Sequence, residues 1–154
     1  MVSLDLIGAQ VLAPEGLHRG DLSITDGLIA DGRVGRPVDL SGFLVLPGIV
    51  DLHGDAFERH MAPRRGAMKQ IDEGLIAAEA ELAANGITTA VLAQFVSWEG
   101  GLRGPEFAAK VFGAIRDTGP TLPTDLRGQL RFEVNLLDLY DGLPDQMAEW
   151  GADY

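Results

Sequence analysis

The sequence of 154 residues contains no cysteine, which excludes disulfides, thiolate metal centres and a cysteine nucleophile. Aromatic residues make up only 6% of the chain, and no apolar run approaches the ~20 residues that span a bilayer. Basic residues are also few, since 12 of them stand against 23 acidic ones and leave a net charge of −11. Such a chain repels nucleic acids and anionic membranes, so we expect neither as a partner. Because the N-terminus lacks a basic start followed by a long apolar stretch, we expect a cytoplasmic protein.

What the chain does contain is typical of a globular protein, with 46% hydrophobic and 23% charged residues. Residues 1–45 are rich in turns and short β-like stretches. The dipeptide Asp26-Gly27 separates the apolar stretches 22–25 and 28–30, which predicts a hairpin. We therefore expect a small antiparallel β unit over 1–45, followed by a second segment over 46–154.

The second segment shows a different pattern. The nearly continuous apolar stretch 43–53 predicts a strand buried on both faces. Periodicity and caps then predict the further elements, namely a helix over 69–85, a strand over 87–96, a helix from 105 to about 116, a strand over 128–135 and a helix over 143–150. This alternation indicates an α/β fold with a parallel sheet, βαβαβα in order. A closed (β/α)₈ barrel takes roughly 250 residues, so three such units form either a small open sheet or the first part of a barrel.

Polar residues follow the first predicted parallel strand and form the strongest candidate site. His53 and Asp55 are separated by one residue, so in extended backbone both side chains point to the same side. An imidazole and a carboxylate together suit Zn²⁺, Mn²⁺ or Fe²⁺. The alternative is a polar loop in which the two residues cap the next helix.

The residues around this pair resemble a known family. Residues 46–53 read L-P-G-I-V-D-L-H and are similar to the P-G-hydrophobic-hydrophobic-D-x-H signature of the amidohydrolase superfamily. Most members continue as H-x-H, whereas this chain has Asp55. That departure resembles the phosphonate-metabolism protein M group (α-D-ribose 1-methylphosphonate 5-triphosphate diphosphatase), as do the segments E-R-H at 58–60, P-R at 63–64 and G-I-T-T at 86–89.

The resemblance implies the N-terminal part of a small β-sandwich and the first three βα units of a TIM-type barrel. It also implies a divalent metal, Zn²⁺ in the first place with Mn²⁺ or Fe²⁺ as alternatives, bound by His53, Asp55 and Glu133. For Glu133 the alternative is a solvent-facing acid or a partner of Arg131. The implied reaction is hydrolysis by metal-activated water.

The family's remaining ligands and its general base come from later strands, so we expect the chain alone to be an inactive fragment of the hydrolase. The alternative is a non-catalytic binding or assembly module. Such a module pairs through its exposed sheet edge with a copy of itself or with the missing C-terminal half of the barrel.

Basic residues gather just after the motif. Four of the chain's 12 basic residues, Arg59, Arg64, Arg65 and Lys69, lie within 11 positions. Since guanidinium groups bind phosphate oxygens in a bidentate manner, Arg59, Arg64 and Arg65, together with His60, are candidates for binding a small anionic substrate such as a phosphate ester. The alternative is a solvated loop whose arginines pair with nearby acids.

Overall fold

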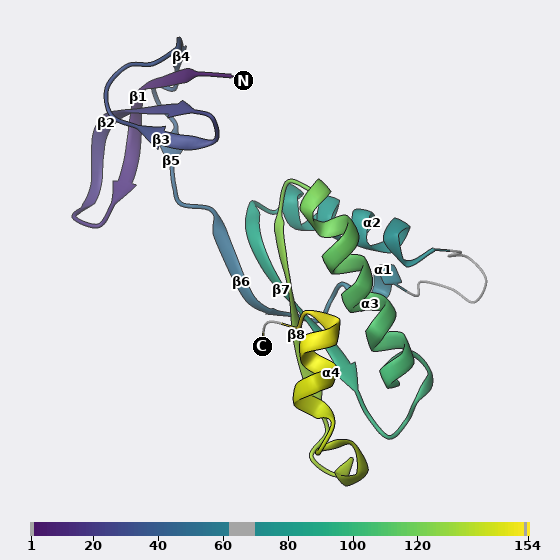
Figure 1. The fold of residues 1–154 in the computed structure, drawn as a ribbon. Helices are drawn as coiled ribbons and strands as arrows, with labels where there is room; N and C mark the ends of the chain where they lie inside the picture. Colours follow the sequence, from purple (N-terminus) through teal and green to yellow (C-terminus); the bar gives the residue numbers. More distant parts are fainter. Residues whose placement is uncertain (1, 62–69, 153) are drawn as a thin grey trace. The chain divides into compact units, whose positions relative to one another are not determined.

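The computed structural model describes residues 2–61, 70–152 and 154, and it divides the chain into two compact units. The first unit ends at Pro47 and the second begins at Gly48. Figure 1 shows strands alone in the first unit, and strands with helices in the second. The α/β class and the partial-barrel order predicted from the sequence are confirmed, and each unit is described by itself below.

The first unit is a five-stranded sheet made of β1 (Leu4–Ala13), β2 (Gly16–Thr25), β3 (Leu28–Ala30), β4 (Arg36–Asp39) and β5 (Leu44–Val45). The predicted hairpin is present, because β2 and β3 pair antiparallel across Asp26 and Gly27, both of which have positive φ. The expectation of a purely antiparallel unit is wrong, since β4 and β5 both pair parallel to β1. After β3 the chain crosses to the other side of β1 and runs in the same direction as that strand.

The second unit contains the parallel strands β6 (Ile49–Gly54), β7 (Ile87–Val96) and β8 (Asp125–Phe132), in that spatial order. Its helices are α1 (Glu58–Met61), α2 (Ile71–Ala84), α3 (Pro105–Thr118) and α4 (Leu143–Trp150), with short 3₁₀ turns η1 (Gly101–Arg103), η2 (Gly119–Thr121) and η3 (Leu137–Leu139). In the described ranges, none of the helices is long and apolar enough to cross a membrane.

The ends of α2 follow from local chemistry. Asn85 caps the helix, and Gly86 then takes φ +76°, a left-handed conformation that favours glycine. The helix therefore stops directly before β7, as the Asn-Gly pair predicts. Pro105 occupies the first turn of α3, where its missing N–H leaves no hydrogen bond unmade.

The three-stranded sheet has two different faces. Even-numbered residues of β7 and β8, among them Leu92, Val96 and Leu130, pack into the core together with residues of α2, α3 and α4. On the helices, Phe112 and Trp150 stack with ring centroids 5.6 Å apart. Because side chains alternate along a strand, Gln129 and Arg131 of β8 point to the opposite face.

The stretch 43–53 differs from its prediction. It forms two strands, β5 and β6, with Pro47 and Gly48 between them. The predicted burial on both faces is wrong, because Val50 is 54% and Leu52 72% exposed. Among the described strands β6 pairs only with β7, so it is an edge strand, and the apolar run cannot distinguish an edge from a centre.

The last strand also differs in its limits, since β8 ends at Phe132 instead of at the predicted 135. Glu133 therefore stands just beyond the strand. Its backbone N–H donates to the carbonyl of Val96 at 3.2 Å, which fixes its position next to the end of β7.

Gly128 provides a test of the packing beneath the polar face. A Cβ at this position would lie 2.7 Å from Phe112 Cδ1, so Gly128→Ala forces the buried ring to move. We expect a loss of roughly 1–3 kcal/mol in the free energy of unfolding, measured by urea denaturation. Gly113→Ala on α3 is the matched control, because its Cβ meets only Arg116 at 3.9 Å. It should gain about 0.5–1 kcal/mol from helix propensity. Equal effects of the two variants would contradict this description of the core.

Candidate active-site face

The candidate metal residues meet side chains of β8 across the middle strand. His53 Nδ1 is hydrogen-bonded to Gln129 Oε1, and Arg131 Nη1 donates to Asp55 Oδ2 at 3.2 Å. Gln129 and Arg131 are two residues apart on one face of β8, so His53 and Asp55 reach the same face. The geometry thus brings the two together as their spacing predicts. We call these four residues the polar row.

The polar row can form because the residue between its two strands is small. Gln129 is the register partner of Ala93 on β7, and Ala93 is fully buried. A methyl group leaves room for the side chains from β6 and β8 to meet above β7. Arg131 is the register partner of Phe95, and its guanidinium lies 4.8 Å from the centre of that ring, within the range of a cation–π interaction.

The hydrogen bond to Gln129 also orients the imidazole. Because the contacting atom of Gln129 is a carbonyl oxygen, Nδ1 of His53 is the donor of this hydrogen bond, and in a neutral imidazole Nε2 then carries the lone pair. Metal-binding histidines commonly hold their second nitrogen in this way. In the described part of the chain, no hydrogen bond reaches Nε2, so this nitrogen is available to a cation.

The third predicted ligand does not join this pair. Oε2 of Glu133 accepts the backbone N–H of Trp98 at 3.3 Å, and Asp55 is paired with Arg131. Within residues 2–61, 70–152 and 154, no three His, Asp or Glu side chains are grouped so that they could hold a metal ion. His53, Asp55 and Glu133 therefore do not fit a complete metal site in this arrangement, and we derive no reaction step through a metal.

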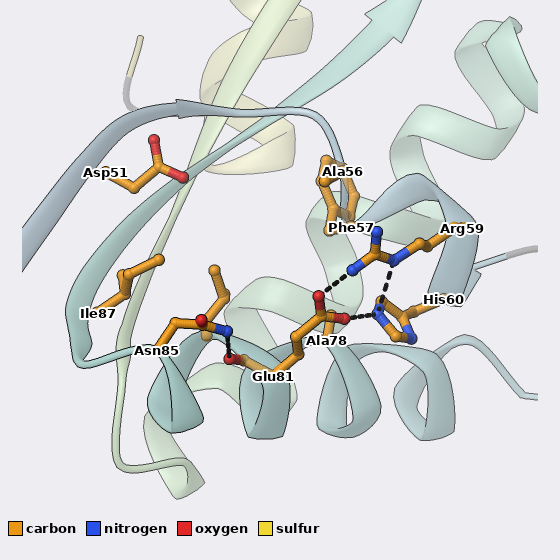
Figure 2. A pocket seen from close by; sticks show the side chains of 10 residues that line it. Asp51, Ala56, Phe57, Arg59, His60, Ala78, Glu81, Asn85 and Ile87 are labelled. Atoms are coloured by element: carbon orange, nitrogen blue, oxygen red, sulfur yellow. Dashed lines mark hydrogen bonds and ion pairs between the residues drawn. The ribbon is translucent and has the colours of Figure 1, made fainter.

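The predicted anion-binding residues lie in a different place. Both Arg59 and His60 of α1 pair with Glu81 of α2, His60 through Nε2 at 2.6 Å. These three residues line a pocket of about 190 Å³ that also includes Asp51 and Phe57 but not the polar row (Figure 2). Arg64 and Arg65 lie outside the described residues.

The pKa of Glu81 in this pocket is displaced from its ordinary value. The hydrogen bond from Arg59, followed by that from His60, holds the pKa of the Glu81 carboxyl below its usual value. Glu81 therefore joins α2 to α1 through its charged carboxylate, and in this arrangement Arg59 and His60 both contact an acid of the chain itself.

Gln129 and Arg131 are the residues that our sequence analysis did not assign to the site. The signal was present, because residues 126–133 read L-R-G-Q-L-R-F-E, with polar side chains at every second position. In a half-buried strand this alternation marks one uncovered polar face. The pairing of these residues with His53 and Asp55 spans 76 positions, and no local pattern reveals it.

Comparison with known proteins supplies the wider context. No family model matches the sequence, and no curated protein matches it significantly. Solved structures do match. The chain is 20% identical to a chain of the formyltransferase/hydrolase complex of Methylorubrum extorquens, with a TM-score of 0.56 over 96% of this chain and 29% of that chain.

Two further structures are hydrolases by name. An L-hydantoinase (dihydropyrimidinase) from Arthrobacter aurescens is 17% identical, with a TM-score of 0.54 over 94% of this chain and 31% of its own. An amidohydrolase from an environmental sample of the Sargasso Sea is 17% identical, with a TM-score of 0.50 over 95% and 41% of the two chains. The likeness shows that the chain has the fold of the N-terminal part of such hydrolases. It spans less than half the length of each.

The Glu81 cluster gives a prediction for pH dependence. Because its pKa is lowered in the folded chain, the carboxylate adds stability above its unfolded pKa of about 4.3 and loses it as the pH falls through the folded value. Glu81→Gln should lower the melting temperature at pH 7, and its difference from the wild type should shrink as the pH falls below the unfolded pKa and disappear once the folded carboxyl is protonated.

The matched control for this experiment is Glu73→Gln, an exposed position on the same helix. Thermal melts of both variants across this pH range isolate the contribution of Glu81. A Glu81→Gln difference that stays constant with pH, or that Glu73→Gln reproduces, would count against the cluster.

Proposed function

We propose that this chain forms the N-terminal part of a metal-dependent hydrolase of the amidohydrolase superfamily. In this proposal the chain contributes the part of the active site that lies at the ends of β6, β7 and β8. The polar row carries the proposal. Catalytic residues of (β/α) folds lie at the carboxyl ends of the strands, and the row joins the ends of β6 and β8 on the face away from the helices.

Each member of the row has a role that its geometry supports. His53 presents Nε2, since its Nδ1 is held by Gln129. The carboxylate of Asp55 is the second metal-binding group on that side, through its oxygen atoms. Because catalytic zinc sites use three protein ligands, these two residues form part of a donor set and the remainder is supplied from elsewhere. Glu133, which follows Arg131 by two positions, is a candidate to join the set after release of Trp98.

We further propose an anionic substrate, in particular one carrying a phosphate or phosphonate group. The support is Arg131, a cation at the end of β8, together with the arginines at positions 64 and 65 of the sequence. Arg59 and His60 no longer count as support, because both pair with Glu81. Guanidinium groups bind such oxygens with two parallel hydrogen bonds. The resemblance to the phosphonate-metabolism protein M group favours the same class of substrate. The choice of zinc over manganese or iron also belongs to this proposal.

Metal binding tests the proposal on the chain itself. Equilibrium dialysis with Mn²⁺ or Zn²⁺ should show binding that His53→Ala weakens at least about tenfold. Loss of a residue that only hydrogen-bonds a metal ligand already lowers metal affinity by about that factor, and loss of the ligand itself should cost no less. His18→Ala is the matched control, since this histidine belongs to β2 in the first unit. Equal affinity of the wild type and His53→Ala would contradict the proposed site.

Hydrolysis by the isolated chain is a second readout for the same variants. With two donors in the row, we expect no turnover of p-nitrophenyl phosphate in the presence of Mn²⁺ above that of His53→Ala. Turnover that exceeds this variant would show that the chain forms a working site alone, contrary to the proposal that it supplies only part of the site.

A second candidate function, assembly through the sheet edge, has its own support. Among the described strands β6 has a partner on one side only, and Val50 and Leu52 are more than half exposed on it. A strand with free N–H and C=O groups and apolar side chains is a template for pairing with another strand. The partner in this proposal is a second copy or the remaining part of a barrel.

Sedimentation measurements distinguish this candidate. If β6 pairs between copies, the 16.4 kDa chain should sediment as a dimer or larger species at micromolar concentration. Leu52→Lys should then return it to a monomer. Leu17→Lys, at a 50% exposed position of the first unit, is the control and should leave the assembly unchanged. A wild-type monomer would exclude self-assembly through this edge.

A further inference from the structure

The cation beside Asp55 in this structure is a side chain. Arg131 donates to Asp55 at 3.2 Å and lies over the ring of Phe95 at 4.8 Å. The neighbouring arginine of the same ring, Arg103, is already paired with Glu99 at 2.7 Å. Arg131 therefore supplies the positive charge at the position where the H-x-D spacing predicts a divalent ion.

We infer that Arg131 is the resident counterion of Asp55, and that a divalent cation binds at His53 and Asp55 only by displacing it. This inference rests on the proposed function, since it concerns the same site. It explains why the donors do not form a metal site as they stand: the carboxylate is occupied by a guanidinium and the imidazole is not. Arg131 is thus a residue that sets the affinity of the site for metal.

Exposure makes the exchange feasible without unfolding. The side chain of Asp55 is 60% exposed and that of Arg131 is 36% exposed, so an ion from solution reaches the carboxylate directly. A partly exposed ion pair is weak, whereas a fixed positive charge close to a divalent ion repels it. The weakness of the pair allows a divalent ion to displace the guanidinium, and removal of Arg131 ends both the competition for the carboxylate and the repulsion, so it should tighten metal binding.

Mn²⁺ is the probe for the test, with the free ion counted by its EPR signal. Arg131→Gln should bind Mn²⁺ roughly five- to tenfold more tightly than the wild type. Arg131→Lys, which keeps the charge but lacks the planar fork and the stacking surface, should fall between the two. Arg127→Gln is the matched control, because Arg127 lies on the same face of β8 and pairs with Asp125. It should change nothing.

The double variant Arg131→Gln with Asp55→Asn shows whether the gain depends on the carboxylate, and it should remove the gain. Thermal melts establish that each variant is folded. If Arg131→Gln does not fold, the comparison of Arg131→Lys with the wild type still decides the test. An affinity that is unchanged or weaker in both Arg131 variants overturns the inference, as does a gain that Arg127→Gln shares.

The two proposals fail in different ways. If His53→Ala weakens Mn²⁺ binding while the Arg131 variants do not tighten it, the metal site stands and the counterion role is wrong. If neither the wild type nor any Arg131 variant binds Mn²⁺, both the metal site and the inference are wrong.

Discussion

The alternation of side chains along β8 is the constraint on which the site depends. One set of positions, including Leu130, is apolar and packs with the helices, while the other set places Gln129 and Arg131 on the opposite face. A slip of one residue would exchange the two sets and bury an arginine in the core. Burial of the apolar set therefore fixes the register, and the register in turn places the polar row. Core packing and site geometry are two results of one pairing.

The uncovered face stays polar and yet holds its side chains in definite positions. Ala93 leaves the space, the amide of Gln129 orients the imidazole, and Phe95 supports the guanidinium. Each contact alone is weak, since these groups are partly exposed. Together these contacts allow β8, which is not adjacent to β6 in the sheet, to restrict the side chains of His53 and Asp55. This explains how an edge strand with exposed apolar residues can still present an oriented histidine.

Sequence patterns predicted those elements whose ends carry local signals. The limits of β7 and α4 agree with the prediction, because Asn85-Gly86 precedes the first and Pro144 lies in the first turn of the second. The prediction failed for the strand at 43–53, since apolar content reports neither the break at Pro47 and Gly48 nor an edge position. The spacing of His53 and Asp55 indicated their common face, whereas their partners on β8 arise from tertiary pairing alone.

The H-x-D pattern and the ion that it binds are separate properties of this fold. The two donors stand two residues apart at the end of β6, with His53 on the strand and Asp55 just after it, and this spacing would exist whatever faced them. What neutralises the carboxylate is decided by β8, where Arg131 stands at the right register position to reach it. A neutral side chain there would leave the same motif as an open carboxylate beside an oriented imidazole. The same two residues at the end of β6 therefore give either a vacant donor pair or an internal ion pair, according to one position on a different strand.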